Sequence, residues 1–168
     1  MKIAIISDIH DNLENLRKFL SWAAKDKPDG LICCGDITNS ESLEVLASGF
    51  GGKIYLAKGN IELYEEEELE NYKQIEYFGK IGNLKIDGHR VGFCHEPYLI
   101  DRILESDDWD IIFYGHTHRP WIEDREGVKL VNPGTLGGVF AKATFAVWDT
   151  KSGSLELKIL EDLKIDYC

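Results

Sequence analysis

Hydrophobic and polar positions follow one pattern in the first half of the chain and another in the second. In the first half, fully apolar runs alternate with helix-length amphipathic segments: the runs span residues 2–7, 30–36 and 53–60, and the segments span 12–25 and 42–48. Such alternation is typical of parallel strands that are covered by helices. The first half therefore predicts a parallel β-sheet with helices packed on it.

The second half has apolar runs that lie closer together and are joined by turn dipeptides. These runs span residues 83–95, 124–132 and 144–160, and a helix over 98–106 precedes a strand over 109–116. Short strands joined by tight turns are typical of a mixed or antiparallel sheet. We therefore expect an α/β fold in which the two halves form two sheets on one core, with helices outside.

Length and composition add limits on domain number and compartment. With 168 residues, of which 43% are hydrophobic, the chain can bury the core of one domain over residues 1–168. No apolar run has the length of a signal peptide or a membrane span, so we expect a cytoplasmic protein without a membrane partner. Cys33, Cys34 and Cys94 do not have the spacing of a disulfide framework or zinc site and are predicted as core residues.

The net charge of -11 limits the possible partners. Clustered lysine and arginine residues supply most of the affinity for long nucleic acid, so we do not expect such a partner. A small anionic substrate would need a local positive field to enter the site.

Five of the apolar runs end in residues that bind metals. The candidates are all oxygen or imidazole ligands, namely Asp8, His10, Asp36, Asn60, His95, His116 and His118. Each one alone has an ordinary explanation as a helix cap, a turn residue or a buried histidine. Together they include four of the five histidines, all at strand ends, where ligands gather in α/β sheets. The remaining one, His89, lies in a turn and is predicted to be exposed.

Two pairs of candidates are each separated by one residue, and this spacing predicts how their side chains lie. In an extended strand, Asp8 and His10 would face the same side with α-carbons roughly 6.5 to 7 Å apart, and so would His116 and His118. Each pair would then converge on one metal or divide between two metals about 3.5 to 4 Å apart. Histidine and carboxylate ligands suit Mn, Fe, Ni, Co or Zn.

A family resemblance rests on the short motifs that contain these residues. The runs "DIH" at 8–10, "GD" at 35–36, "GN" at 59–60 and "GHTH" at 115–118, with His95 between them and "NPG" at 132–134 after them, resemble the calcineurin-like metallophosphoesterases. The small bacterial and archaeal phosphodiesterases of that superfamily are the most similar, over residues 1–149. The resemblance implies a four-layer α/β/β/α sandwich of two mixed sheets flanked by helices, with a dinuclear metal centre.

The resemblance also implies a role for each ligand. Asp8, His10 and His118 would hold one divalent ion, Asn60, His95 and His116 would hold the other, and Asp36 would bridge them. The implied activity is hydrolysis of a small phosphodiester by a metal-bridging water or hydroxide, with no catalytic side chain identified. Two divalent ions, two aspartates and one hydroxide leave a centre near +1, which suits a diester monoanion.

The sequence departs from the family pattern at three places: Ile61, Glu96 and the acidic run over residues 65–68. Ile61 replaces a histidine that protonates the leaving group in many relatives, and an alkyl side chain cannot transfer a proton. Glu62 stands where relatives carry an acid that supports the ligands, and it either orients Asn60 or a neighbour or begins a helix. Glu96 replaces a glycine and would narrow the site or repel dianionic monoesters. The acidic run over residues 65–68 is predicted to be a solvated helix face.

Two readings without catalysis stay open. A eukaryotic retromer subunit resembles the same fold and acts as a protein-binding scaffold, and a metal-bound regulator could sense nucleotides without hydrolysing them. All seven ligand positions carry residues able to bind metal, which favours the enzyme. The sequence does not distinguish among cyclic nucleotides, short nucleic-acid ends and other small diesters.

Overall fold

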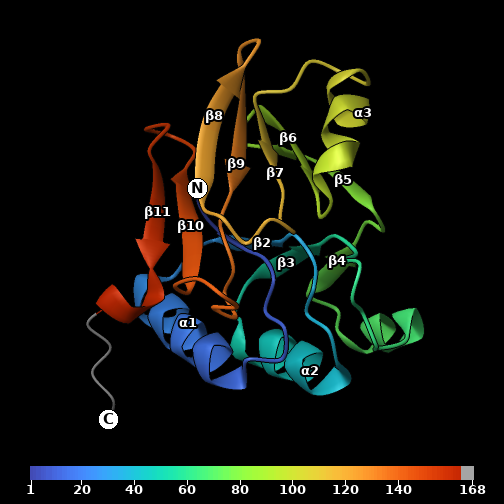
Figure 1. Ribbon diagram of the computed structural model, residues 1–168, viewed down its shortest axis with the longest axis vertical. Helices are drawn as coiled ribbons and strands as arrows, with labels where there is room; N and C mark the ends of the chain where they lie inside the picture. The colour runs from blue at the N-terminus through green and yellow to red at the C-terminus, as the bar shows by residue number, and fades with distance from the viewer. Residues whose placement is uncertain (164–168) are drawn as a thin grey trace.

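The computed structural model describes residues 1–163, which form two β-sheets and the helices around them (Figure 1). The larger sheet has six strands in the order β11-β10-β1-β2-β3-β4. Strands β1 to β4 run parallel to one another, whereas β10 is antiparallel to β1 and to β11. The strands are β1 (Lys2–Ile6), β2 (Gly30–Cys33), β3 (Lys53–Leu56), β4 (Ile75–Tyr77), β10 (Thr144–Asp149) and β11 (Leu155–Ile159).

The smaller sheet has five strands in the order β5-β6-β7-β9-β8. Its three inner strands are parallel, and an antiparallel strand forms each edge. The strands are β5 (Ile81–Ile86), β6 (His89–Cys94), β7 (Ile111–Phe113), β8 (Trp121–Arg125) and β9 (Val128–Asn132). Both sheets therefore contain neighbouring parallel strands whose carboxyl ends can deliver side chains to one edge.

Three α-helices and three 3-10 helices complete the fold: α1 (Leu13–Asp26), α2 (Ser40–Gly49), α3 (Ile100–Leu104), η1 (Glu66–Asn71), η2 (Pro97–Leu99) and η3 (Leu160–Asp162). The two longer helices begin at asparagine caps, because the side chains of Asn12 and Asn39 accept hydrogen bonds from backbone N–H groups of the first turn. Helix α1 ends where Lys27 takes a left-handed conformation and its N–H bonds the Ala23 carbonyl.

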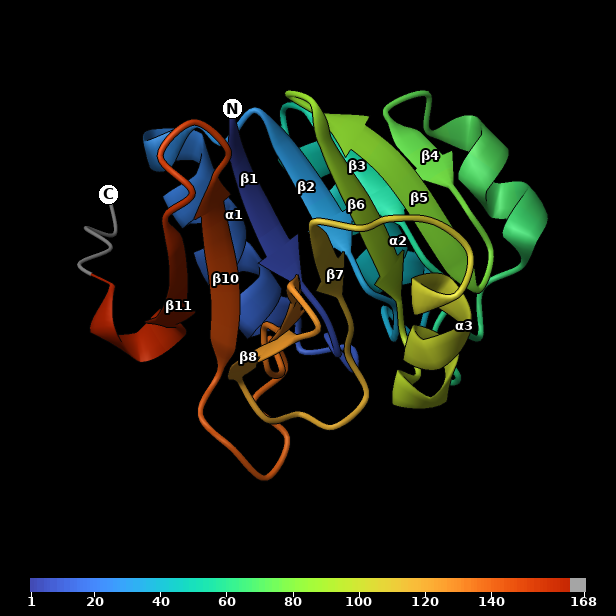
Figure 2. The same ribbon diagram turned by 90° about the horizontal axis from the view of Figure 1, so that it is seen from above.

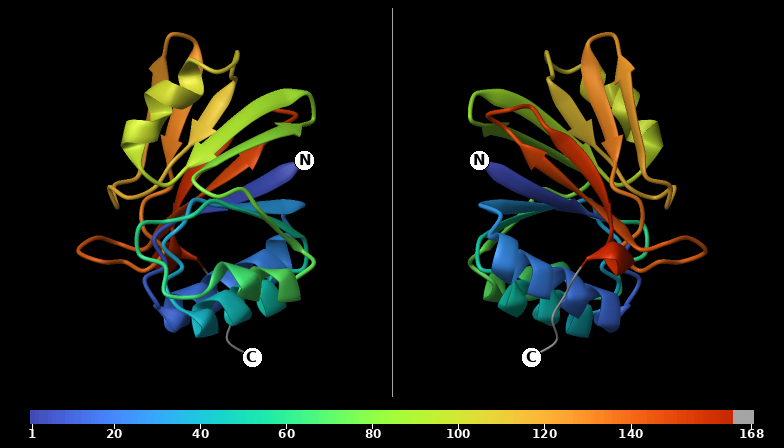
Figure 3. Two further views of the ribbon diagram at one scale, coloured as in Figure 1. Left: turned by 90° about the vertical axis from the view of Figure 1, so that its right-hand side faces the viewer. Right: turned by 90° about the vertical axis from the view of Figure 1, so that its left-hand side faces the viewer.

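These elements stack in four layers, as seen edge-on in Figure 3. In Figure 2, α3 and the five-stranded sheet lie in front of the six-stranded sheet, and α1 and α2 lie behind it. Strand β1 is buried on both faces: Ala4 and Ile6 pack toward α1 and α2, and Ile3 and Ile5 pack against the other sheet. The predicted four-layer α/β sandwich of two mixed sheets is confirmed, while a single domain over residues 1–168 stays a prediction.

The division of the two sheets at mid-chain was wrong. Strands β10 and β11 come from the second half but extend the first sheet beyond β1. Strand β1 has β2 on only one side, and β10 pairs with its other edge from Lys2↔Asp149 to Ile5↔Ala146. Filling that open edge satisfies the backbone groups of a strand that is buried on both faces.

The two weaker helix predictions also need correction. Only Ile100–Leu104 of the segment 98–106 is α-helical, after the 3-10 turn at Pro97–Leu99. The acidic run precedes and enters the 3-10 helix η1, not an α-helix, and Glu66 pairs with Lys58 at 2.5 Å. Residues 65–67 are exposed, as expected of a solvated segment.

Predictions for the remaining residues have mixed outcomes. Cys33, Cys34 and Cys94 are buried and free, as predicted, and burial raises the pKa of Cys94 to about 12. His89 is only partly exposed, contrary to prediction, because its ring packs edge-on against Trp148 and its Nε2 lies 3.1 Å from the Thr150 carbonyl. Residues 1–163 contain no helix long and apolar enough to cross a membrane.

Candidate metal centre

All of the predicted ligands lie in loops that follow parallel strands. The loops after β1, β2 and β3 carry Asp8, His10, Asp36 and Asn60, and those after β6 and β7 carry His95, His116 and His118. The structure brings all seven side chains together at one edge of the two packed sheets.

One group of side chains forms around a carboxylate oxygen of Asp8. Its Oδ1 lies 3.1 Å from Nε2 of His118 and 3.6 Å from Nε2 of His10. The two imidazole Nε2 atoms are 3.0 Å apart. Three potential ligand atoms therefore face one point, and Asp8, His10 and His118 lie close enough to hold a single cation.

A second group forms around the side-chain oxygen of Asn60. Its Oδ1 lies 2.8 Å from Nε2 of His95 and 2.9 Å from Nδ1 of His116. These residues come from loops after three different strands, β3, β6 and β7. The histidines of the "GHTH" motif therefore divide between the two groups, which is one of the two arrangements expected from their spacing.

Both aspartates lie between the two groups. Asp36 Oδ2 is 3.2 Å from Nε2 of His95 and 3.8 Å from Nε2 of His10. Asp8 Oδ1 is also 4.0 Å from Nε2 of His95, so Asp8, Asp36 and His95 make another set of close ligand atoms. The resemblance implied a bridging position for Asp36 alone, whereas the geometry gives Asp8 a central position as well.

The expected extended backbone at the two pairs was wrong. Strands β1 and β7 end at Ile6 and Phe113, before either pair begins. Asp8, His10, His116 and His118 have φ angles of 55°, 46°, 69° and 58°, in the left-handed region. Non-glycine residues rarely adopt this conformation, which concentrates at functional sites where the surrounding structure enforces it.

A backbone carbonyl orients one imidazole of the site, and the two carboxylates give the site a negative field. His95 Nδ1 lies 2.8 Å from the Cys34 carbonyl, so Nδ1–H donates to it and the Nε2 lone pair faces the site. The negatively charged carboxylate of Asp8, whose Oδ1 lies 3.6 Å from Nε2 of His10, raises the pKa of His10 above its usual value. Burial opposes ionisation of Asp36, but His95 and the other partners outweigh it and lower the pKa of Asp36.

The surroundings of one Asp8 oxygen indicate whether the residues of the site fit a metal ion. Asp8 is fully buried, and its Oδ1 has no hydrogen-bond partner among residues 1–163. A buried carboxylate oxygen without a partner is costly, and a divalent cation between Asp8, His10 and His118 would satisfy it. The donor set is entirely oxygen and imidazole nitrogen, so the residues fit divalent ions.

Glu62 supports the loop that carries Asp36. Its Oε1 accepts hydrogen bonds from the N–H groups of Asp36 (2.8 Å), Gly59 (3.1 Å) and Ile37 (3.4 Å), and Oε2 accepts one from Thr38 (2.9 Å). Glu62 lies outside any helix, so it is not a helix N-terminal residue. Burial raises the pKa of Glu62, although these N–H groups partly offset the effect.

Glycines let the ligand loops approach one another closely. A Cβ atom on Gly59 would lie 2.1 Å from Oδ1 of Asp36 and 2.2 Å from its backbone nitrogen. A Cβ atom on Gly115 would lie 2.0 Å from Oγ of Ser7. The glycines of the "GN" and "GHTH" motifs therefore leave room for the neighbouring loops and their aspartates.

Two further residues, one at the end of β9 and one just after it, support the loops of the site. Asn132 Nδ2 donates to the Gly115 carbonyl (2.8 Å) and to Oγ1 of Thr117 (3.0 Å), holding the "GHTH" loop. Thr135 Oγ1 donates to the carbonyl of Asp8 at 2.9 Å. Sequence reasoning assigned no role to Thr135. Both residues are buried, Asn132 ends an inner strand and Thr135 follows it, and this position at a strand end could have identified them.

The other departures lie beside the site. Ile61 is 45% exposed, and only its backbone N–H contacts a ligand, donating to Oδ1 of Asp36 at 2.9 Å. The Glu96 side chain is buried, with Oε1 3.6 Å from Nζ of Lys80 and 3.5 Å from the hydroxyl of Tyr98. Glu96 is therefore engaged by a lysine and a tyrosine next to His95.

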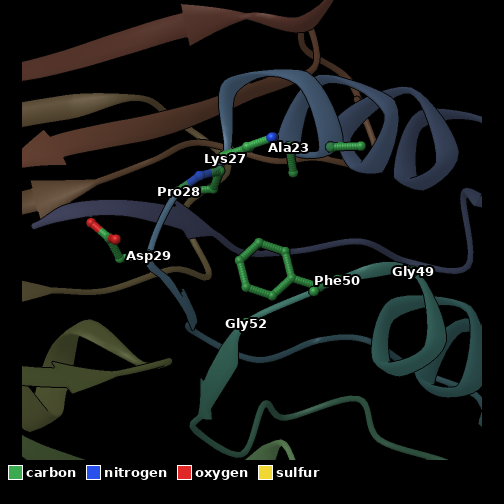
Figure 4. A pocket seen from close by; sticks show the side chains of 9 residues that line it. Ala23, Lys27, Pro28, Asp29, Gly49, Phe50 and Gly52 are labelled. Carbon is green, nitrogen blue, oxygen red and sulfur yellow. The ribbon is translucent and has the colours of Figure 1, made fainter.

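A separate hollow lies between the ends of α1 and α2 (Figure 4). Phe50 fills its floor, and Lys27 and Asp29 are its only charged lining residues within the described chain. It contains none of the predicted ligands and no histidine or cysteine. The potential metal ligands therefore lie at the candidate centre at the strand ends and not in this hollow.

Comparisons with known proteins identify the family of the chain. Residues 1–153 match the calcineurin-like phosphoesterase superfamily domain. Phosphodiesterase MJ0936 of Methanocaldococcus jannaschii is 25% identical over 173 residues, covering 96% of this chain and all of the relative. Among solved structures, one characterised as a novel archaeal phosphodiesterase superposes with a TM-score of 0.85 at 24% identity, over 95% of this chain and 99% of the other.

A solved structure from another group shares the fold. Vps29 of Chaetomium thermophilum superposes with a TM-score of 0.72 at 16% identity, covering 95% of each chain. At that identity the likeness shows the fold alone, whereas the superfamily match spans most of the sequence. The chain belongs to the calcineurin-like phosphoesterase superfamily.

Proposed function

We propose that this chain is a metal-dependent phosphodiesterase with a dinuclear centre. The observation that carries the proposal is the pair of ligand groups with Asp8 and Asp36 between them, where the buried Oδ1 of Asp8 has no partner among the described residues. Membership of a phosphoesterase superfamily and similarity to a relative named as a phosphodiesterase support the same chemistry.

Different residues of the chain would bind each of the two ions. Asp8, His10 and His118 would hold one, Asn60, His95 and His116 the other, and Asp36 would contact both. When bound, such ions polarise phosphoryl oxygens and make a hydroxide nucleophile available near neutral pH. Metal identity remains a choice among Mn, Ni, Fe, Co and Zn, all of which accept these ligands.

The surrounding residues favour a small monoanionic diester as substrate. The aspartates cancel part of the charge of the ions and leave a modest positive field in a chain of net charge -11. Glu96 follows His95 and is partly balanced by the exposed Lys80 at 3.6 Å, and its remaining negative charge would disfavour a dianionic monoester. Glu62 and Asn132 keep the loops of the ligands fixed and so preserve the geometry for the reaction.

Turnover of a generic diester tests the proposal. The protein would be stripped with a chelator, supplied with Mn, Ni or Zn, and assayed with bis(4-nitrophenyl) phosphate beside 4-nitrophenyl phosphate. We expect metal-restored hydrolysis with preference for the diester. Tight metal binding with no diester turnover under any ion would contradict the enzyme and favour the alternative, a metal-binding scaffold on the same fold.

Ile61 leads to a prediction about the leaving group. General acid catalysis contributes about 10²- to 10⁴-fold, mostly for poor leaving groups, and an alkyl side chain cannot supply it. We therefore expect the logarithm of the rate to fall steeply as leaving-group pKa rises across a series of aryl diesters. Ile61→His should partly rescue the slow substrates.

The matched control for that series is Leu63→His, which adds an imidazole at an exposed position two residues further on. It should leave the slope as in the wild type. A flat wild-type plot, measured where the chemical step limits turnover, would show that another group donates the proton.

A further inference from the structure

A hollow is lined by residues of the segment that carries His116 and His118 and of the strand β8 that follows it. Tyr114, Thr117, Arg119 and Trp121 line it. These positions interleave with His116 and His118, and residues 116–122 form an uninterrupted stretch of exposed or partly exposed positions. The hollow is therefore joined to two candidate ligands by a short exposed stretch of chain.

The indole ring of Trp121 is an exposed aromatic surface in this hollow, and a hydrogen bond restricts its orientation. Its side chain is 57% exposed, and its Nε1 donates a hydrogen bond to Oε2 of Glu123 at 3.2 Å, which restricts the ring. Its backbone pairs with Asn132, which itself holds the "GHTH" loop. Three residues span at most about 11 Å, so Trp121 is also tied closely to His118 through the chain.

Arg119 follows His118 in the chain, two residues before Trp121, and adds a cation to this segment. Its guanidinium has no hydrogen bond or ion pair with any residue in the range 1–163, and the side chain is exposed. In a protein of net charge -11, an unpaired arginine beside an anion-binding centre supplies a local attraction. Its planar fork is suited to phosphate oxygens.

We propose that Arg119 and Trp121 form a specificity subsite for a nucleotide diester, in which the indole of Trp121 stacks on the base and Arg119 contacts the phosphate. This inference rests on the proposed function and names its substrate class. Base–aromatic stacking tolerates every base, because each has a π-face, so the subsite selects an aromatic base without reading its identity.

The test compares two diesters that share one leaving group: thymidine 5′-(4-nitrophenyl phosphate) and methyl 4-nitrophenyl phosphate. Wild-type protein should favour the thymidine ester in kcat/KM by about 5- to 100-fold, the range typical of one stacked base. Trp121→Ala should bring this ratio near one, and Trp121→Phe should retain most of it. Arg119→Gln should raise KM for both esters, and the neighbouring control Ile122→Ala should leave the ratio as in the wild type.

A binding measurement separates this inference from the proposed function. Calorimetric titration of the metal-loaded protein with thymidine 5′-monophosphate should show weaker binding in Trp121→Ala than in Ile122→Ala. If the wild type hydrolyses neither ester, the proposed function fails. In that case, equal affinity of Trp121→Ala and Ile122→Ala for thymidine 5′-monophosphate overturns the subsite as well. Hydrolysis of both esters with a ratio near one, or a ratio retained in Trp121→Ala, overturns the subsite alone.

Discussion

Asp36→Asn is expected to lower diester turnover by more than about 100-fold, the upper limit typical of residues that only support a metal ligand. The carboxylate of Asp36 lies between His95 and His10, at 3.2 and 3.8 Å. A neutral amide is a poor bridge between two cations, so metal content should fall from two ions to one or none per chain. Elemental analysis of the purified variant beside the diesterase rate measures both effects.

The matched control for this substitution is Asp108→Asn. It makes the same chemical change at a fully exposed carboxylate outside the site, so rate and metal content should match the wild type. Two tightly held ions and a near-normal rate in Asp36→Asn would contradict the dinuclear assignment. Circular dichroism shows whether either variant has lost its fold.

Gly59→Ala is expected to damage both stability and metal binding. Its Cβ atom would lie 2.1 Å from Oδ1 of Asp36 and 2.2 Å from the Asp36 nitrogen, which is backbone and cannot rotate away. Overpacking costs about 1 to 3 kcal/mol and more when backbone must move. The loop of Asp36 would have to shift, so we expect a lower thermal midpoint and at least tenfold weaker metal affinity, roughly the loss caused by disturbing a ligand's support.

Gly51→Ala provides the control within the same chain. A Cβ atom there meets nothing within 4 Å, and the residue does not have a positive φ. The change should leave the thermal midpoint unchanged or raise it slightly, because alanine restricts the unfolded chain. A thermal midpoint and metal affinity in Gly59→Ala equal to those of Gly51→Ala would show that the two ligand loops are not closely packed.

The sequence predicted the layers of the fold because burial leaves a direct mark on it. Strand β1 is buried on both faces and is apolar at every position from Ile3 to Ile6. The neighbours of β10 and β11 could not be predicted in this way. Alternation of side chains identifies a strand and its buried face, but the choice between the two sheets depends on which edge lies open.

The site was predicted better in composition than in geometry. The residue types and their positions after strands identified the side chains that meet, because parallel strands deliver their carboxyl ends to one edge. The extended geometry of Asp8 and His10 was wrong because β1 ends at Ile6 and tertiary hydrogen bonds then set the backbone. Ile9 and His10 both donate their N–H groups to the Asp36 carbonyl, a contact between distant segments that local spacing does not reveal.

If two ions bind at these strand ends, anomalous diffraction from crystals grown with Mn²⁺ will locate both of them. Two anomalous peaks should appear roughly 3.5 to 4 Å apart, the separation usual in two-metal sites. One should contact Asp8, His10 and His118, the other should contact Asn60, His95 and His116, and Asp36 should reach both. A single peak, or peaks away from these residues at saturating Mn²⁺, would contradict the dinuclear centre.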